Sequence, residues 1–175
     1  MLIANYTIEE TGNPPPIIFT DPDTYFEQSH QNKSLVLGTE WLTTVDKNSP
    51  ITEIRFQCYK PSHGRLLHFK TNSQNQWGRH IVDYVLMKSN NSVDCFHEPA
   101  SCNGFKSSLV PLTRDASFLS SDPNRIGYHN KFQRLYNHVI FKAGIYNFIM
   151  RNDRLNCDDN TIDNVKDSWW KIFLR

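Results

Sequence analysis

The chain has 175 residues, and 19 Lys and Arg face 18 Asp and Glu, which gives a formal net charge of +1. This near-neutral charge offers no large field to nucleic acid or to an anionic membrane surface, so neither is expected as a partner. No apolar run approaches the roughly 20 residues that cross a bilayer, and the first residues lack the pattern of a signal peptide. The length suits one domain, which we expect to span residues 1–175.

Aromatic residues make up 13% of the chain, and this enrichment favours strands. In chain order, the patterns predict strands at 2–8 and 17–20, separated by the "NPPP" run. "DPDTYFEQ" at 21–28 begins with a turn signal and favours a short helix, whereas "SLVLGTEWLTTV" at 34–45 predicts one or two strands interrupted at Gly38.

The clearest strand of the N-terminal half is "ITEIRFQCYK" at 51–60. Its alternation places Ile54, Phe56 and Cys58 on one side and polar residues on the other. "PSHG" then predicts a turn, and "RLLHFK" at 65–70 is the expected antiparallel partner. After the polar run "TNSQNQWGRH" at 71–80, "HIVDYVLMK" alternates again, so this run is interpreted as a loop between two strands.

The C-terminal half predicts strands near 95–97, 105–110, 132–142 and 145–151, with the longest loop at 112–130. The polar run "NDRLNCDDNTIDNVKD" precedes a last strand, "SWWKIFLR", in which Trp170, Ile172 and Leu174 share one face. Trp169 must then point the opposite way, so one of the two tryptophans is expected in the core and the other exposed or at an interface. Together these patterns predict an all-β, antiparallel, jelly-roll-like β-sandwich with little helix.

Four cysteines, Cys58, Cys95, Cys102 and Cys157, allow two disulfides with three pairings in an oxidising compartment. No CxxC pair is present, and Cys95 with Cys102 would bridge the "CFHEPASC" loop. Reduced, buried thiols are an equal alternative for a domain of this size. The cysteines therefore leave both the redox state and the compartment open.

The familiar catalytic sequence motifs are missing, including GxSxG, HExxH, the P-loop and GxGxxG. "DCFHE" at 94–98 is a weak metal candidate, because Asp94 and His97 would point to opposite faces of a strand. We therefore expect a protein that is not an enzyme.

The most acidic run, "CDDNTIDNVKD" at 157–167, offers the oxygen ligands that calcium prefers. The candidate ligands are Asp158, Asp159, Asn160 and Asp163. The spacing does not match an EF-hand, and a solvated polar loop is the favoured alternative. No other cofactor is expected.

The run at 71–80 combines one large aromatic ring with many planar hydrogen-bonding groups. A neutral sugar needs both: an aromatic face for its C–H side, and amide, guanidinium or imidazole groups for adjacent hydroxyls. The predicted ligand-binding residues are Asn75, Trp77, Arg79 and His80. The favoured alternative is that Trp77 folds back to cover the edge of the sandwich while its neighbours face water.

The segments "GRLLHFKTNSQNQWGRHIVDYVLM", "SLVP", "GIYNF" and "WWKIF" follow one another in an order that resembles the bacterial inclusion-body protein family of the AidA/PixA type. The resemblance covers residues 64–175. It implies a single all-β domain of jelly-roll type, cytoplasmic accumulation in some members and glycan binding in others. It implies no catalytic residue.

The leading expectation is thus a lectin-like module that binds a glycan or glycoconjugate through the Trp77 loop. The rival is a structural or self-assembling protein, an inclusion-body or adhesion component, in which exposed aromatics such as Trp169 or Trp170 form a homo-oligomer interface. A cytoplasmic and a secreted location are both open.

Overall fold

A computed structural model describes residues 1–28, 30–31, 34–86, 88, 93–94, 109–112, 125–126, 139–142, 146–152, 154–159, 161 and 163–175. These residues form a mostly β fold with three short α-helices, arranged as two hydrogen-bonded sheets. The mostly-β expectation is therefore confirmed.

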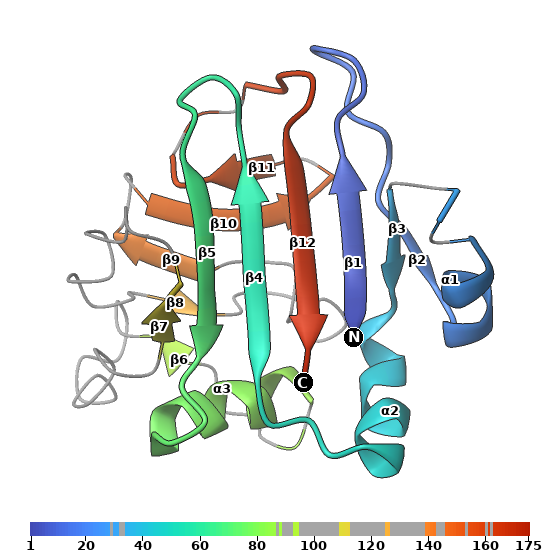
Figure 1. The fold of residues 1–175 in the computed structure, drawn as a ribbon, viewed down its shortest axis with the longest axis vertical. Coiled ribbons are helices and arrows are strands. Elements are labelled where there is room, and N and C mark those ends of the chain that lie inside the picture. Colours follow the sequence, from blue (N-terminus) through green and yellow to red (C-terminus); the bar gives the residue numbers. More distant parts are fainter. Residues whose placement is uncertain are drawn as a thin grey trace.

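The larger sheet has seven strands in the order β2-β3-β1-β12-β4-β5-β7. Neighbouring strands in this sheet are antiparallel, except for β2 and β3, which are parallel. The strands are β1 (Leu2–Thr7), β2 (Ile18–Thr20), β3 (Leu35–Leu37), β4 (Ile54–Tyr59), β5 (Leu66–Thr71), β7 (Leu109–Pro111) and β12 (Trp169–Leu174). The strands at the two ends of the chain thus lie side by side in the middle of the sheet (Figure 1).

The smaller sheet has five antiparallel strands in the order β11-β10-β9-β8-β6. Its strands are β6 (Val93–Asp94), β8 (Arg125–Ile126), β9 (Val139–Lys142), β10 (Tyr146–Arg151) and β11 (Arg154–Cys157). In Figure 1 this sheet lies behind the larger one, and its β10 strand runs across the direction of β4 and β12.

Aromatic and covalent contacts join the two sheets. The ring of Phe148 on β10 meets the rings of Phe56 and Phe69 at centroid distances of 5.4 and 6.1 Å. A disulfide between Cys58 and Cys157 connects β4 to β11, with the two Cα atoms 5.7 Å apart. The core therefore lies between the sheets, and for these two cysteines the structure decides the redox state that the sequence left open: they form a disulfide.

The strand patterns with the clearest alternation are confirmed. Strand β4 buries Ile54, Phe56 and Cys58, and β5 is its antiparallel partner. Strand β12 buries Trp170 completely and leaves Trp169 half-buried on the other face. This confirms that the two tryptophans face opposite ways, one in the core and the other partly exposed, and shows which is which.

The helices are α1 (Pro22–Gln28), α2 (Leu42–Asn48) and α3 (Gln76–Val85), with a 3-10 turn at Thr39–Trp41 before α2. Helix α1 confirms the helix predicted at 21–28. The strand expected across 34–45 is correct only for β3, because α2 follows it. The strand expected at "HIVDYVLMK" is wrong, since most of that segment belongs to α3.

Helix α3 forms because its apolar residues also satisfy helical spacing. Gly78, Ile81, Val82 and Val85 are all buried, at intervals of three and four residues that place them on one face of a helix. The Asn75 side chain caps the helix by accepting a hydrogen bond of 2.8 Å from the backbone N–H of Trp77. The apolar residues in 80–88 thus fit both the two-residue period of a strand and the 3.6-residue period of a helix.

Two further differences concern segments predicted to be polar or irregular. Strand β11 forms inside the run interpreted as a polar loop, and β8 lies inside the loop expected at 112–130. The strand expected at 95–97, the "DCFHE" metal candidate beyond Asp94 and the Cys95–Cys102 bridge lie outside the described residues.

Candidate functional site

The residues predicted to bind a sugar lie at the start of helix α3, so the Trp77 loop is instead the first turn of a helix. Trp77 is half-buried and packs against the hydrophobic core. Its ring also meets the His80 ring edge-on, at a centroid distance of 6.2 Å. Asn75 is the helix cap. Trp77, Asn75 and His80 thus all make contacts that stabilise the helix start, as the alternative interpretation expected for the tryptophan.

A hollow of about 450 Å³ lies beside this helix, and Arg79 is the one predicted residue that lines it. Its floor contains two side chains that are almost fully buried, Ile51 and Val82. Its polar lining consists of Thr52, Ser73, Gln74, Arg79 and Asp83. We call it the α3 pocket.

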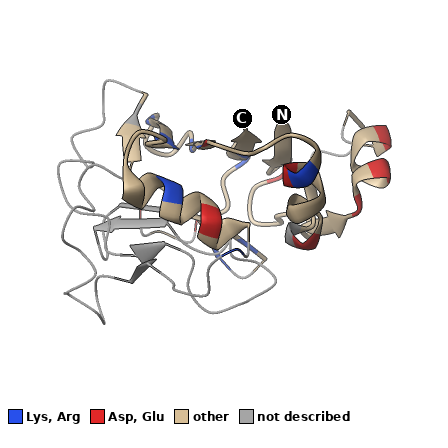
Figure 2. Ribbon diagram, turned by 90° about the horizontal axis from the view of Figure 1, so that it is seen from below, with Lys and Arg blue, Asp and Glu red and all other residues tan. Residues whose placement is uncertain are grey.

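The polar lining of the α3 pocket offers several kinds of hydrogen-bonding group. Arg79 and Asp83 are four residues apart and therefore neighbours on one side of the helix. Figure 2, which views the molecule from the α3 end, shows a blue basic segment and a red acidic segment on this helix. The Arg79 guanidinium donates a 3.3 Å hydrogen bond to the Ser73 carbonyl, which holds it over the connection from β5. The pocket thus combines planar donors and acceptors above an apolar floor.

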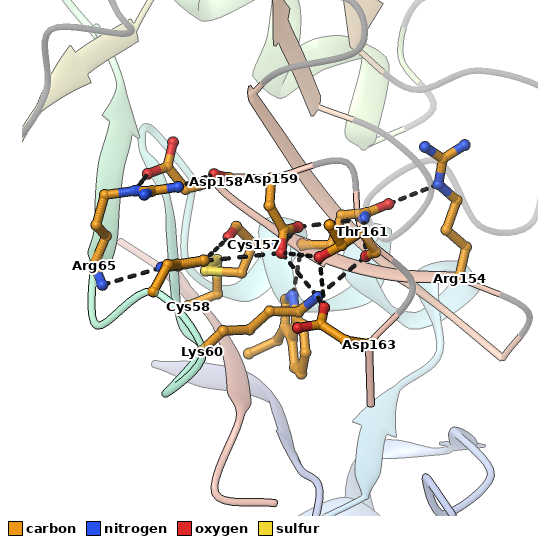
Figure 3. A network of polar contacts seen from close by, with 12 residues as sticks. Cys58, Lys60, Arg65, Arg154, Cys157, Asp158, Asp159, Thr161 and Asp163 are labelled. Atoms are coloured by element: carbon orange, nitrogen blue, oxygen red, sulfur yellow. Dashed lines mark hydrogen bonds and ion pairs between the residues drawn. A yellow bond between two sulfur atoms is a disulfide. The ribbon is translucent and has the colours of Figure 1, made fainter. Parts of the chain in front are cut away.

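The acidic run forms a second polar cluster, shown in Figure 3. The fully buried ammonium group of Lys60 lies 3.0 Å from an Asp159 oxygen and 2.7 Å from an Asp163 oxygen. Lys60 also donates to the Thr161 carbonyl, and Asp159 accepts from the backbone N–H of Cys157. A lysine therefore supplies the cation that the carboxylates of this segment bind in the structure.

Asp158 points towards a different cation, Arg65, whose side chain bonds both its carboxylate and its backbone carbonyl. Burial raises the pKa of Asp158, although the Arg65 guanidinium opposes this effect. One Asp158 carboxylate oxygen is buried without a hydrogen-bond partner in the described structure.

Asp163 shows the opposite balance. Burial alone would raise its pKa, but hydrogen bonds from Lys60, Thr161 and Ser62 outweigh burial and lower the pKa to about 2. Within the described residues, no group of three or more His, Cys, Asp or Glu side chains is arranged to hold a metal ion. Asn160 is not among them, so the calcium site stays a prediction.

The sequence interpretation did not identify a third feature, the outward face of the larger sheet. Strands β1, β12, β4 and β5 each turn alternate side chains away from the core, and cross-strand pairing aligns these side chains in rows. The three rows are Thr7–Trp169–Tyr59–Leu66, Asn5–Lys171–Gln57–His68 and Leu2–Phe173–Arg55–Lys70. We call these twelve residues the open face.

Figure 1 views the open face directly and shows no described helix or strand in front of its four strands. All twelve side chains are partly exposed. The Trp169 and Tyr59 rings lie nearly parallel at 6.2 Å, and the Lys171 ammonium is 5.2 Å from the Trp169 ring centroid. The sequence already indicates this face in the alternation at 54–59 and 169–174. The residues there that face away from the core are aromatic, amide or basic, and none is acidic.

No protein-family model, no curated protein and no solved structure matches this chain. In the described part of the chain, no helix is long and apolar enough to cross a bilayer.

Proposed function

We propose that the protein is a non-enzymatic carbohydrate-binding module that recognises a neutral glycan or glycoconjugate in the α3 pocket. The observation that carries this proposal is the lining of that pocket, with five polar side chains around a floor of Ile51 and Val82. Sugar sites use this combination because planar amide, guanidinium and carboxylate groups bond adjacent hydroxyls, while an apolar surface receives the C–H groups.

The proposal keeps the segment predicted from the sequence but changes the roles of its residues. Arg79 and Gln74 bind the sugar, because both line the pocket. Asn75, Trp77 and His80 position the helix instead, through the cap and the ring contacts. The aromatic stacking role first given to Trp77 has no support from the pocket lining.

The proposal also includes the topology of the sheets, the family relationship and the compartment of the protein. We infer a jelly-roll-like arrangement of the two packed sheets and a relationship with the AidA/PixA-type inclusion-body family. The Cys58–Cys157 disulfide favours an oxidising, secreted location over cytoplasmic inclusions. A calcium ion at Asp158, Asp159, Asn160 and Asp163 is the one cofactor proposed; to bind it, the three carboxylates would exchange their ion pairs with Lys60 and Arg65 for the metal.

A glycan array with matched variants tests the pocket. Gln74→Ala and Arg79→Ala remove hydrogen-bonding groups from the lining, and each is expected to lower affinity for the bound glycan about tenfold. Gln76→Ala is the control, because Gln76 is exposed on the first turn of the same helix and does not line the pocket. Equal glycan affinity of the Gln74→Ala and Gln76→Ala variants would contradict binding in the α3 pocket.

The second candidate function is self-assembly, and it rests on exposed apolar side chains at one edge. Strand β2 is at the end of the seven-stranded sheet, and its Ile18 is 41% exposed. Phe26 on the adjacent helix α1 is 49% exposed. Edge strands of this kind pair readily with another copy. Trp170 cannot contribute as first expected, because it is fully buried.

Light scattering over a concentration series tests self-assembly. If the β2 edge is an interface, the wild-type mass rises with concentration, whereas the Phe26→Ser variant stays a monomer. A wild-type protein that remains a monomer throughout argues against this function.

A further inference from the structure

The open face is hollowed in two places, neither of which belongs to the α3 pocket. The first hollow, of about 520 Å³, lies where helix α1 approaches the sheet; it is lined by Met1, Leu2, Asn5, Thr7, Tyr25, Phe26, His30 and Lys171. The second, of about 450 Å³, is lined by Met1, Arg55, Gln57, His68, Phe173, Leu174 and Arg175. Met1 lines both hollows, so they adjoin.

The charges of these hollows have one sign. Their linings contain the cations Arg55, Lys171 and Arg175, and neither lining contains an aspartate or glutamate. Burial and the neighbouring Arg55 lower the pKa of His68, so its imidazole adds no charge at neutral pH. The nearest carboxylate that the contacts reveal is Glu53, which is almost fully buried and bonds Arg55 and Lys70 from the end of the sheet. One carboxylate against these cations leaves a positive surface on a protein whose formal net charge is only +1.

The remaining lining supplies the groups that a sugar ring needs. The Phe173 ring and the Gln57 amide belong to the second hollow, and the Asn5 amide and the Thr7 hydroxyl belong to the first. Lys171 and Phe173 are two residues apart on one strand, which separates them by about 7 Å. An extended ligand can therefore contact both hollows at once.

We propose that the open face binds an acidic polysaccharide, with Arg55 and Arg175 receiving its carboxylate or sulfate groups. The guanidinium group suits this role because its planar donors match the two oxygens of such an anion. Phe173 contacts the apolar side of a sugar ring, and Gln57 and Asn5 bond hydroxyls. This site uses no residue of the α3 pocket and does not depend on the function proposed for it.

Charge and ring geometry favour a polysaccharide over single-stranded nucleic acid. A nucleic acid carries a phosphate at every residue, and its non-specific partners present broad basic grooves with aromatic faces free for base stacking. Here the Trp169 ring already faces Tyr59 and lies under the Lys171 ammonium.

The test measures the affinity of the purified full chain for an oligogalacturonate, with a neutral maltooligosaccharide and an oligothymidylate as comparison probes. At low salt, Arg55→Gln and Arg175→Gln are each expected to weaken oligogalacturonate binding about tenfold, because each removes a charge-assisted hydrogen bond. Lys47→Gln is the matched control, since it removes one positive charge from the exposed end of helix α2, away from the open face.

Arg175→Gln keeps the test valid if Arg55→Gln disturbs the contact with Glu53, because Arg175 is exposed and lies beyond the end of β12. Weaker binding in both variants, with unchanged binding in Lys47→Gln and Arg79→Ala, supports the open face. Oligothymidylate binding that matches or exceeds oligogalacturonate binding overturns the choice of ligand. The site is overturned if the protein does not bind oligogalacturonate, or if Arg79→Ala is the only variant that loses this binding. The glycan array with Gln74→Ala tests the α3 pocket separately.

Discussion

Lys60 fixes the conformation of a segment that lies about a hundred positions further along the chain. Its ammonium group is fully buried and bonds Asp159, Asp163 and the Thr161 carbonyl. Removing a charge from water costs several kcal/mol, which only close opposite charges and hydrogen bonds offset. The acidic run is therefore ordered by an internal lysine, and its carboxylates are already engaged.

The pH dependence of stability follows from Asp163. Its pKa is about 2 in the folded protein against an ordinary aspartate value of 3.8, so on acidification the unfolded chain takes up this proton first. The stabilisation is present above about pH 4 and is lost as the pH falls from about 4 to about 2. We expect the urea midpoint of the wild type to fall through this window, and that of Asp163→Asn to fall less.

Asp158 acts with the opposite sign, because burial raises its pKa in the folded state. Its contribution to stability therefore increases as the pH falls through the raised pKa towards about 4, just above the window in which the contribution of Asp163 is lost. The comparison of wild type with Asp163→Asn isolates the latter, since both proteins contain Asp158. Parallel curves for the two proteins between pH 4 and pH 2 would contradict the assignment.

At the scale of elements, helix α3 depends on one close approach of backbone to backbone. Gly78 is buried in its first turns, directly against the preceding connection. A Cβ added there would lie 2.7 Å from the Asn72 carbonyl carbon, a separation that real side chains do not tolerate. This contact holds the α3 pocket together, because Ser73 and Gln74 on that connection meet Arg79 on the helix.

Gly78→Ala is therefore expected to destabilise the protein, although alanine is the better helix former by about 1 kcal/mol. Overpacking against a fixed backbone typically costs about 1–3 kcal/mol, which exceeds that gain. Thermal unfolding measures the difference. Gln76→Ala, at an exposed position of the same helix, is the control and should be neutral or slightly stabilising. If the Gly78→Ala protein is as stable as wild type, the Gly78 backbone does not approach the Asn72 backbone as closely as described.

At the scale of the whole molecule, the disulfide joins the sheets across a sequence separation of 99 residues. Beside it, the Trp170 indole N–H donates to the Asn156 carbonyl at 2.9 Å, and His63 lies 2.8 Å from the Cys157 carbonyl. Covalent, aromatic and polar contacts thus meet at one place between β4, β11 and β12.

Replacing both cysteines, as Cys58→Ala with Cys157→Ala, is expected to lower the free energy of unfolding by about 2–5 kcal/mol, because the unfolded chain loses a long cross-link. Urea unfolding of the variant and wild type measures this. A reducing agent should bring the wild type close to the variant and leave the variant itself unchanged. Equal midpoints without reductant would mean that the bond contributes nothing to stability.

The α3 pocket shows how much of a candidate site sequence patterns alone can predict. The segment 71–80 was identified as a candidate, and Arg79 does line a pocket, but the partners Thr52 and Asp83 come from elsewhere. The ring of Trp77 offers stacking on a sugar or packing at the sheet edge, and in the structure it is partly buried against the core. A pattern within ten residues cannot show which distant residues complete a pocket.

The sequence by itself determined the strands whose alternation is unambiguous, β4, β5 and β12, because one face must be apolar wherever a sheet covers a core. It also determined that Trp169 and Trp170 face opposite sides of the sheet, so that one lies in the core and the other does not. Only the tertiary structure decided that 76–85 is a helix, that Cys58 pairs with Cys157 and that Lys60 neutralises the acidic run. The disulfide and the Lys60 contacts join segments far apart in the chain, about which local spacing carries no information. The spacing within 76–85 fits a helix and a strand alike, and packing against the core decided between them.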